Sequence, residues 1–183
     1  MILPICVYGN PVLRRKSAEV SMEPAELKQL VSDMFETMYH SQGVGLAGPQ
    51  IGQSLSIFVI DTEPFKEAYD DVEIYKGAFI NPVITNESGA DFTFNEGCLS
   101  LPDIHEDVMR PSTIEITYLD EDLQPHTETI SGGVARIIQH EYDHIEGMVF
   151  TDHLSNLKKM ILKRKLTDIA SGKLHPAYKT KLK

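Results

Sequence analysis

Two histidines one helical turn apart place the strongest constraint on this 183-residue sequence. His140, Glu141 and His144 form a His-Glu-x-x-His motif within a stretch whose apolar residues recur at helical spacing. Residues four positions apart project from the same face of a helix, so both imidazoles can bind one metal ion. Glu141 then lies beside the metal and can take a proton from a bound water. A charged surface helix is the alternative, but the apolar neighbours predict a buried helix, in which His and Glu need partners.

A catalytic metal site needs a third protein ligand and an open position. One class of zinc peptidase has a third histidine ligand where this chain has Phe150. Another class uses a glutamate downstream of the motif, but no glutamate follows Glu146 in this chain, so neither class fits. His153 and His175 match no known ligand spacing. Cys98 is the best candidate, because a thiolate binds zinc, iron or nickel well and its neighbours are glycine, an acid and serine.

The order of predicted elements indicates an α+β fold, with antiparallel strands around the central histidine helix and a helix near the C-terminus. Helices are predicted at residues 24–43, with Leu27, Leu30, Val31, Met34 and Met38 as an apolar stripe, at 131–148 and at 154–170. Strands are predicted at residues 55–60, 78–84 and 92–94, and as a hairpin of 114–118 with 124–130. Residues 62–76 are expected to form a loop, and 173–183 an irregular tail. The whole chain, 1–183, is expected to be one domain.

Composition favours a folded, cytoplasmic protein. The chain is 42% apolar and 24% charged, which is typical of a domain with its own core. No apolar run approaches the length of a membrane span, and no signal peptide is visible at the N-terminus. Two cysteines cannot form a disulfide framework, so a reducing compartment is expected, with Cys6 as a small buried residue.

The charge is divided unevenly along the chain. Residues 154–183 contain nine of the 17 Lys and Arg and one of the 27 Asp and Glu. An acidic body with a basic helix and tail indicates a polyanionic partner for the helix and tail. Binding would depend on charge and would not be specific for a nucleic-acid sequence. The alternative is a solvated helix that packs on the body through its apolar residues, Leu157, Met160, Ile161 and Leu166.

Three ordered motifs resemble those of the bacterial peptide deformylases. They are the glycine-rich segment 43–50, the Glu-Gly-Cys-Leu-Ser sequence at 96–100, and the Gln-His-Glu-x-Asp-His sequence at 139–144. The resemblance extends to about Ser155. Two positions depart from the family pattern: Gly48 stands where alanine is usual, and His105 stands where many members have an arginine near the substrate-binding cleft.

The resemblance implies hydrolytic removal of the N-formyl group from the initiator methionine of nascent polypeptides, with release of formate. It implies that Cys98, His140 and His144 bind the metal, usually ferrous iron, although zinc, nickel and cobalt suit the same ligands. Glu141 would be the general base and acid, and Gln50 and the backbone N–H of Leu99 would stabilise the oxyanion. Four residues would contact the substrate: Val44, Gly45, Gly97 and Ile137. Gly133 and Arg136 would lie near its side-chain pocket.

Two other functions are compatible with the residues alone. The first is a metallopeptidase that cleaves internal peptide bonds. The second is a protein without catalysis that keeps the metal as structural support, although a structural zinc site normally has four protein ligands and only three are found. If the chain is a deformylase, the basic C-terminal helix suggests a contact with the ribosome, because the nascent polypeptide substrate emerges beside ribosomal RNA.

Overall fold

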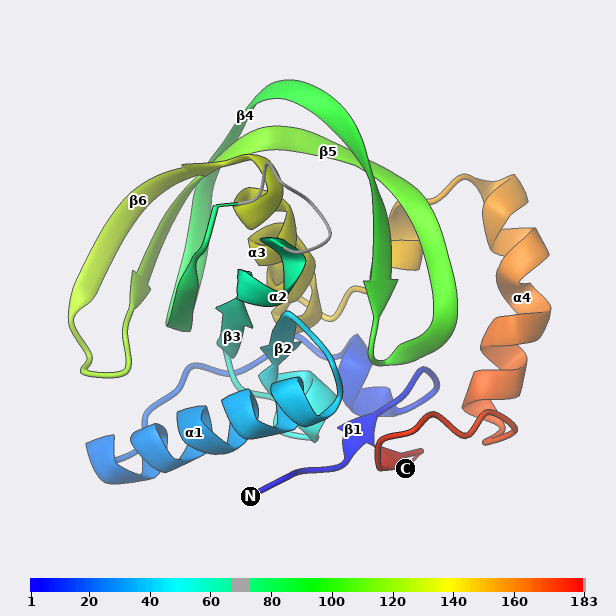
Figure 1. Cartoon of the computed structure of the whole chain (residues 1–183), viewed down its shortest axis with the longest axis horizontal. Coiled ribbons are helices and arrows are strands. Elements are labelled where there is room, and N and C mark those ends of the chain that lie inside the picture. Colours follow the sequence, from blue (N-terminus) through cyan, green and yellow to red (C-terminus); the bar gives the residue numbers. More distant parts are fainter. Residues whose placement is uncertain (67–72, 183) are drawn as a thin grey trace.

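The computed structural model describes residues 1–66 and 73–182 and shows a curved sheet that wraps around a helix (Figure 1). The α-helices are α1 (Pro24–His40), α2 (Glu63–Lys66), α3 (Gly132–Ile145) and α4 (Asn156–Ala170). Short 3-10 helices are η1 (Pro11–Arg14), η2 (Gly48–Ile51) and η3 (Phe150–His153). The strands are β1 (Ile5–Cys6), β2 (Gly45–Ala47), β3 (Ile57–Asp61), β4 (Lys76–Cys98), β5 (Leu101–Leu119), β6 (Pro125–Ser131) and β7 (Thr180–Lys181).

Five strands form one antiparallel sheet in the order β2-β3-β4-β5-β6, and β1 pairs in parallel with β7. The helix that carries the histidine motif, α3, lies inside the curve of this sheet, and α4 stands at the edge of the molecule (Figure 1). The α+β class predicted from the sequence, with antiparallel strands around a central helix and a helix near the C-terminus, is therefore confirmed.

The longest strands, β4 and β5, form a hairpin that arches over α3 (Figure 1). The prediction of two separate short strands at 78–84 and 92–94 is wrong, because β4 runs through both as one strand of 23 residues. Its polar middle is mostly exposed and lacks the apolar alternation by which a half-buried strand is recognised. The register between β4 and β5 shifts at four places, and such irregularities bend a hairpin.

Most other predicted elements are present. The helix at Pro24, the buried strand near residue 57 and the pairing of 114–118 with 124–130 are confirmed. The strand predicted at 114–118 is only the last part of β5, which begins at Leu101. The expected loop at 62–76 contains the short helix α2, and residues 67–72 lie outside the described residues. The tail is not wholly irregular, since β7 pairs with β1; two exposed residues give too little pattern for a prediction.

Apolar side chains cover both faces of the sheet. Successive side chains of a strand point to opposite faces, and in β3 Phe58 and Ile60 pack with α3 whereas Ile57 and Val59 pack with α1. From α3 the buried apolar residues are Val134, Ala135, Ile137, Ile138 and Ile145. All five residues of the predicted α1 stripe are buried: Leu27, Leu30, Val31, Met34 and Met38. The helices α3 and α1 therefore pack on opposite faces of β3.

The orientation of α4 bears on the alternative of a solvated helix packed on the body. In that alternative Leu157, Met160 and Ile161 would pack on the body, but they are 68%, 72% and 68% exposed. The helix instead packs through Leu162 and Ile169, which are buried, with Leu166 beside them. Two apolar stripes run along α4, and periodicity alone does not indicate which of them faces the body.

Among the described residues, none of the helices has the length and apolar character that crossing a bilayer requires.

Candidate metal centre

Three metal-ligating side chains meet between the end of β4 and α3. Cys98 is the last residue of β4, and His140 and His144 lie one turn apart on α3. One ligand atom from each lies within 4.8 Å of the others, and Cys98 Sγ is 3.2 Å from His144 Nε2. Both histidines are buried. The structure therefore brings together the three residues that the sequence singled out as metal ligands.

Glu96 fixes the orientation of His140. Its carboxylate lies 2.8 Å from His140 Nδ1 and accepts two hydrogen bonds from Arg110, at 2.8 and 3.0 Å. Burial alone would raise the pKa of Glu96, but the hydrogen bonds from His140 and Arg110 outweigh it and hold that pKa well below its usual range. An ionised Glu96 accepts the Nδ1 proton, which leaves the Nε2 lone pair of His140 free for a metal.

Gln50 lies behind the cysteine and is fully buried. Its Oε1 accepts a hydrogen bond from the Ala47 N–H at 2.7 Å, so its amide group faces Cys98 Sγ at 3.5 Å and Ser100 Oγ at 3.3 Å. Burial would raise the pKa of Cys98, but the charge and hydrogen bonds of the two neighbouring histidines lower it well below its ordinary value. A thiolate is the form of cysteine that binds metals, so the donor set fits a divalent metal ion.

Glu141 is a buried carboxyl group beside these ligands. Burial raises its pKa to about 7, against the charges of the two neighbouring histidines. Its Oε2 has no hydrogen-bond partner among the described residues. Gly45 lies directly against it, since a Cβ at position 45 would be 2.7 Å from Glu141 Cδ. A carboxyl group with such a pKa can both take and give a proton near neutral pH.

The glycine-rich segment runs beside the turn that follows Cys98. A Cβ at Gly43 would lie 2.8 Å from Leu99 Cδ1, so the two residues are in contact. Val44 follows, half-buried, and β2 then forms one edge of the five-stranded sheet. An edge strand has unpaired N–H and C=O groups that an extended peptide can bind.

Three further positions singled out in the sequence lie in different surroundings. Gly97 is exposed and pairs with His105 across the hairpin. The imidazole ring of His105 lies 2.5 Å from where a Cβ of Gly97 would be. Ile137 is 6% exposed and belongs to the core between α3 and the sheet. Arg136, expected near a substrate pocket, is fully buried and donates to Glu96 Oε1 at 3.0 Å. Arg136 thus neutralises a buried carboxylate, and its place near a substrate pocket stays a prediction.

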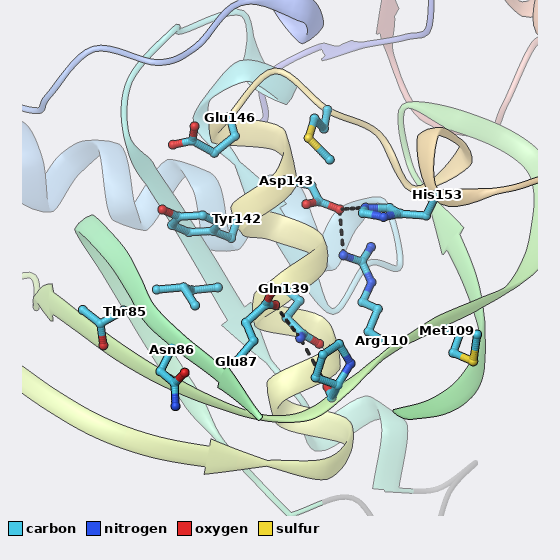
Figure 2. Close-up of a pocket in the computed structure, with 13 residues that line it drawn as sticks. Thr85, Asn86, Glu87, Met109, Arg110, Gln139, Tyr142, Asp143, Glu146 and His153 are labelled. Atoms are coloured by element: carbon cyan, nitrogen blue, oxygen red, sulfur yellow. Dashed lines mark hydrogen bonds and ion pairs between the residues drawn. The ribbon is translucent and has the colours of Figure 1, made fainter. Parts of the chain in front are cut away.

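The polar network continues around α3 to a neighbouring face of the helix, where it borders a cavity of about 690 Å³ (Figure 2). There Arg110 donates to Asp143 Oδ2 at 2.8 Å, and His153 Nε2 lies 2.7 Å from the same oxygen. Figure 2 shows both contacts converging on Asp143. Cys98, His140 and His144 do not line this cavity. His153, which remained as a possible third ligand, thus has a carboxylate partner away from the three converging ligands.

Sequence analysis did not identify the residues that support the metal ligands. Glu96 lies in the motif at 96–100, and its place two residues before Cys98 was the only sign in the sequence that it could support a ligand. Arg110 has no local signal, because it reaches the site only through the pairing of β5 with β4. Ser100 is also in the motif, but its contact with Gln50 depends on the fold.

Comparisons with known proteins identify relatives over nearly the whole chain. A sequence model described as "Polypeptide deformylase" matches residues 2–160. The peptide deformylase of Flavobacterium johnsoniae is 48% identical and aligns over 99% of this chain and 96% of its own length. A crystal structure of a peptide deformylase from Legionella pneumophila superposes with a TM-score of 0.82 at 37% identity, covering 94% of this chain and 98% of that one. The crystal structure of peptide deformylase 1B from Arabidopsis thaliana, in complex with an inhibitor, superposes with a TM-score of 0.83 at 30% identity. The match covers 97% of this chain and 98% of that one.

The contacts of Glu96 generate a prediction about metal affinity. Glu96→Gln keeps the shape of the side chain but removes the charge that orients His140, so we expect zinc affinity to fall about 10–100-fold. Competition with a chelator measures the dissociation constant, and circular dichroism confirms that the variant is folded. Glu115→Gln, which changes an exposed glutamate on β5, is the control. Equal zinc affinity in the parent and in Glu96→Gln would contradict this role.

Proposed function

Because the chain belongs to the polypeptide deformylase family, we propose that Cys98, His140 and His144 hold the metal ion that this family requires. The chain is a metal-dependent hydrolase that removes the N-formyl group from nascent polypeptides. One observation carries the assignment of the site: a thiolate and two imidazoles converge within 4.8 Å, next to a buried glutamate. A divalent metal bound there would supply an activated water and polarise the formyl carbonyl.

Glu141 is the proton carrier in this proposal. In the hydrolysis a water oxygen bonds to the formyl carbon and the carbon–nitrogen bond breaks, leaving formate and a free amine. Glu141 accepts a proton from the water and passes it to the amine nitrogen. Its burial, its pKa of about 7 and its free Oε2 support this role.

Gln50 and Leu99 stabilise the negative charge that develops on the formyl oxygen. Gln50 contributes a side-chain N–H, and its anchored Oε1 supports the role because the amide group cannot turn away. Leu99 contributes its backbone N–H from the turn next to Cys98. Donors already held in place require no reorganisation during the reaction, and one such donor typically changes the rate by about 10²–10³-fold.

The substrate backbone pairs with Val44 and Gly45 at the open edge of the sheet and with Gly97 on the opposite side. Ile137 forms part of the apolar floor under the methionine side chain. His105 lies against Gly97, so it contacts the part of the peptide beyond the methionine, where many family members have an arginine. The whole chain, residues 1–183, acts as one domain in this proposal.

A ribosome contact through α4 is a separate part of the proposal. The stripe of Leu157, Met160 and Ile161 is exposed, and exposed apolar groups gathered on one helix are typical of an interaction surface. Lys163, Arg164 and Lys165 are exposed beside it. Dense phosphate charge attracts such a surface without reading a sequence.

Glu141→Gln tests the catalytic assignment. We expect formate release from a formyl-methionyl peptide to fall by about 10²–10⁴-fold, because the amide cannot carry the proton, while metal content stays at the parent level. Formate production and elemental analysis are measured on the same sample. Glu115→Gln again serves as the control and should keep the parent rate. Loss of the metal from Glu141→Gln would show that Glu141 is a ligand and would contradict the proposed role.

The native metal is proposed to be Fe²⁺, on the strength of the resemblance to bacterial peptide deformylases. A Cys-His-His set also accepts zinc, nickel and cobalt, so the ligands alone do not select among them. We expect protein purified without oxygen to contain about one equivalent of iron and to lose activity in air. Zinc as the main metal in such a preparation would overturn the proposal of iron.

The ribosome contact is tested by reversing charges that have no ion-pair partner among the described residues. Lys158 pairs with Glu106, and Lys159 donates to the carbonyl of Asp152, so changes there would also disturb the fold.

Lys163→Glu combined with Lys165→Glu avoids this problem. We expect the double variant to co-sediment with ribosomes less well than the parent, with a weaker salt dependence, at unchanged activity on a short peptide. Unchanged ribosome binding would refute the contact.

A further inference from the structure

We propose that the C-terminal segment beyond α4 holds the turn after Cys98 in its catalytic shape, with Tyr178 as the positioning residue. The inference rests on the proposed role of the Leu99 N–H as an oxyanion donor. Only Leu99 and Ser100 connect the end of β4 to the start of β5, so an outside contact with either carbonyl of this turn lies within two peptide groups of the donor N–H.

Both carbonyl groups of the turn are bound from outside the hairpin. The Tyr178 hydroxyl donates to the Leu99 carbonyl oxygen at 2.7 Å. The Tyr8 N–H donates to the Ser100 carbonyl oxygen at 2.8 Å. With Cys98 held among the metal ligands on one side and the Leu99 carbonyl held on the other, the Cys98–Leu99 peptide has little freedom to rotate.

The two contacts come from one small structural unit. Tyr8 follows β1, Tyr178 precedes β7, and these strands pair with each other. The pairing includes a hydrogen bond from the Ile5 N–H to the Lys179 carbonyl at 2.8 Å. Figure 1 shows the turn between β4 and β5 next to β1 and the C-terminal end of the chain. The N-terminal and C-terminal segments therefore hold the turn together.

Tyr178 is well placed to remain a hydrogen-bond donor. Its half-buried ring packs with the apolar cluster that includes the buried residues of α1. Leu174 and Leu182, which precede and follow Tyr178 in the sequence, pack against a second cluster that includes Leu101 of β5. Burial, with the nearby charges of Cys98 and Asp103, raises the pKa of Tyr178 above its ordinary value, so the hydroxyl keeps its proton. Tyr178 also lies beyond residues 2–160, the part matched by the family model, so this support is additional to the family motifs.

Tyr178→Phe in the full-length, metal-loaded enzyme removes the hydrogen bond and keeps the ring. Since a single hydrogen bond contributes modestly, we expect kcat for formate release from a formyl-methionyl peptide to fall about 3–10-fold. KM and metal content should stay at parent values. Tyr118→Phe is the control, because it also removes a hydroxyl hydrogen bond, to Glu128, but lies outside the turn; it should leave kcat unchanged.

Hydrogen exchange of the Tyr8 amide, measured by NMR, reports on the turn independently of catalysis. We expect it to accelerate several-fold in Tyr178→Phe, with amides in α1 unchanged, because the Ser100 carbonyl that binds it becomes mobile. Unchanged exchange together with unchanged kcat would overturn the proposal, and so would an effect confined to KM. Faster exchange with parent kcat would instead reject Leu99 as the oxyanion donor, while the contact with the turn would stand.

Discussion

The buried carboxylate of Glu96 joins β4 and α3, which carry the proposed metal ligands, to β5. It extends from β4 and binds Arg110 of β5 together with Arg136 and His140 of α3. A carboxylate removed from water without partners costs several kcal/mol, so it is stable only where all of these donors meet it. The network is therefore satisfied at one relative position of the hairpin and the helix, and that position also determines where Cys98 lies, two residues further along β4.

The same network explains the aspartate of the histidine motif. Asp143 is not among the three converging side chains but accepts a hydrogen bond from Arg110 on a neighbouring face of α3. Arg110 thus bridges Glu96 and Asp143, and its position links the two faces of the helix. Since His153 also binds Asp143, the 3-10 helix that follows α3 is tied to the same group of charges. The proposed metal ligands are consequently held by contacts that extend around α3 from Glu96 to His153.

Local periodicity was enough to predict the parts of the site that lie on one element. His140 and His144 are one turn apart, and their convergence follows from helix geometry alone. The partners of these residues could not be predicted in the same way. Arg110 reaches Glu96 only because β5 returns along β4 through a bent hairpin, and the polar middle of that hairpin gives no periodic signal. The face by which α4 packs could not be predicted for a related reason, since its sequence contains two apolar stripes and only one of them faces the body.

The motif glycines are explained by space rather than by backbone conformation. Neither Gly43, Gly45 nor Gly97 has a positive φ, so other residues could adopt their backbone angles. A Cβ would instead meet Leu99 at position 43, Glu141 at position 45 and His105 at position 97. Each of these contacts brings the backbone against a side chain of the proposed site. The glycines therefore allow the edge strand to approach Leu99 and Glu141, and the hairpin to accommodate His105, as the proposed contacts with the peptide backbone require.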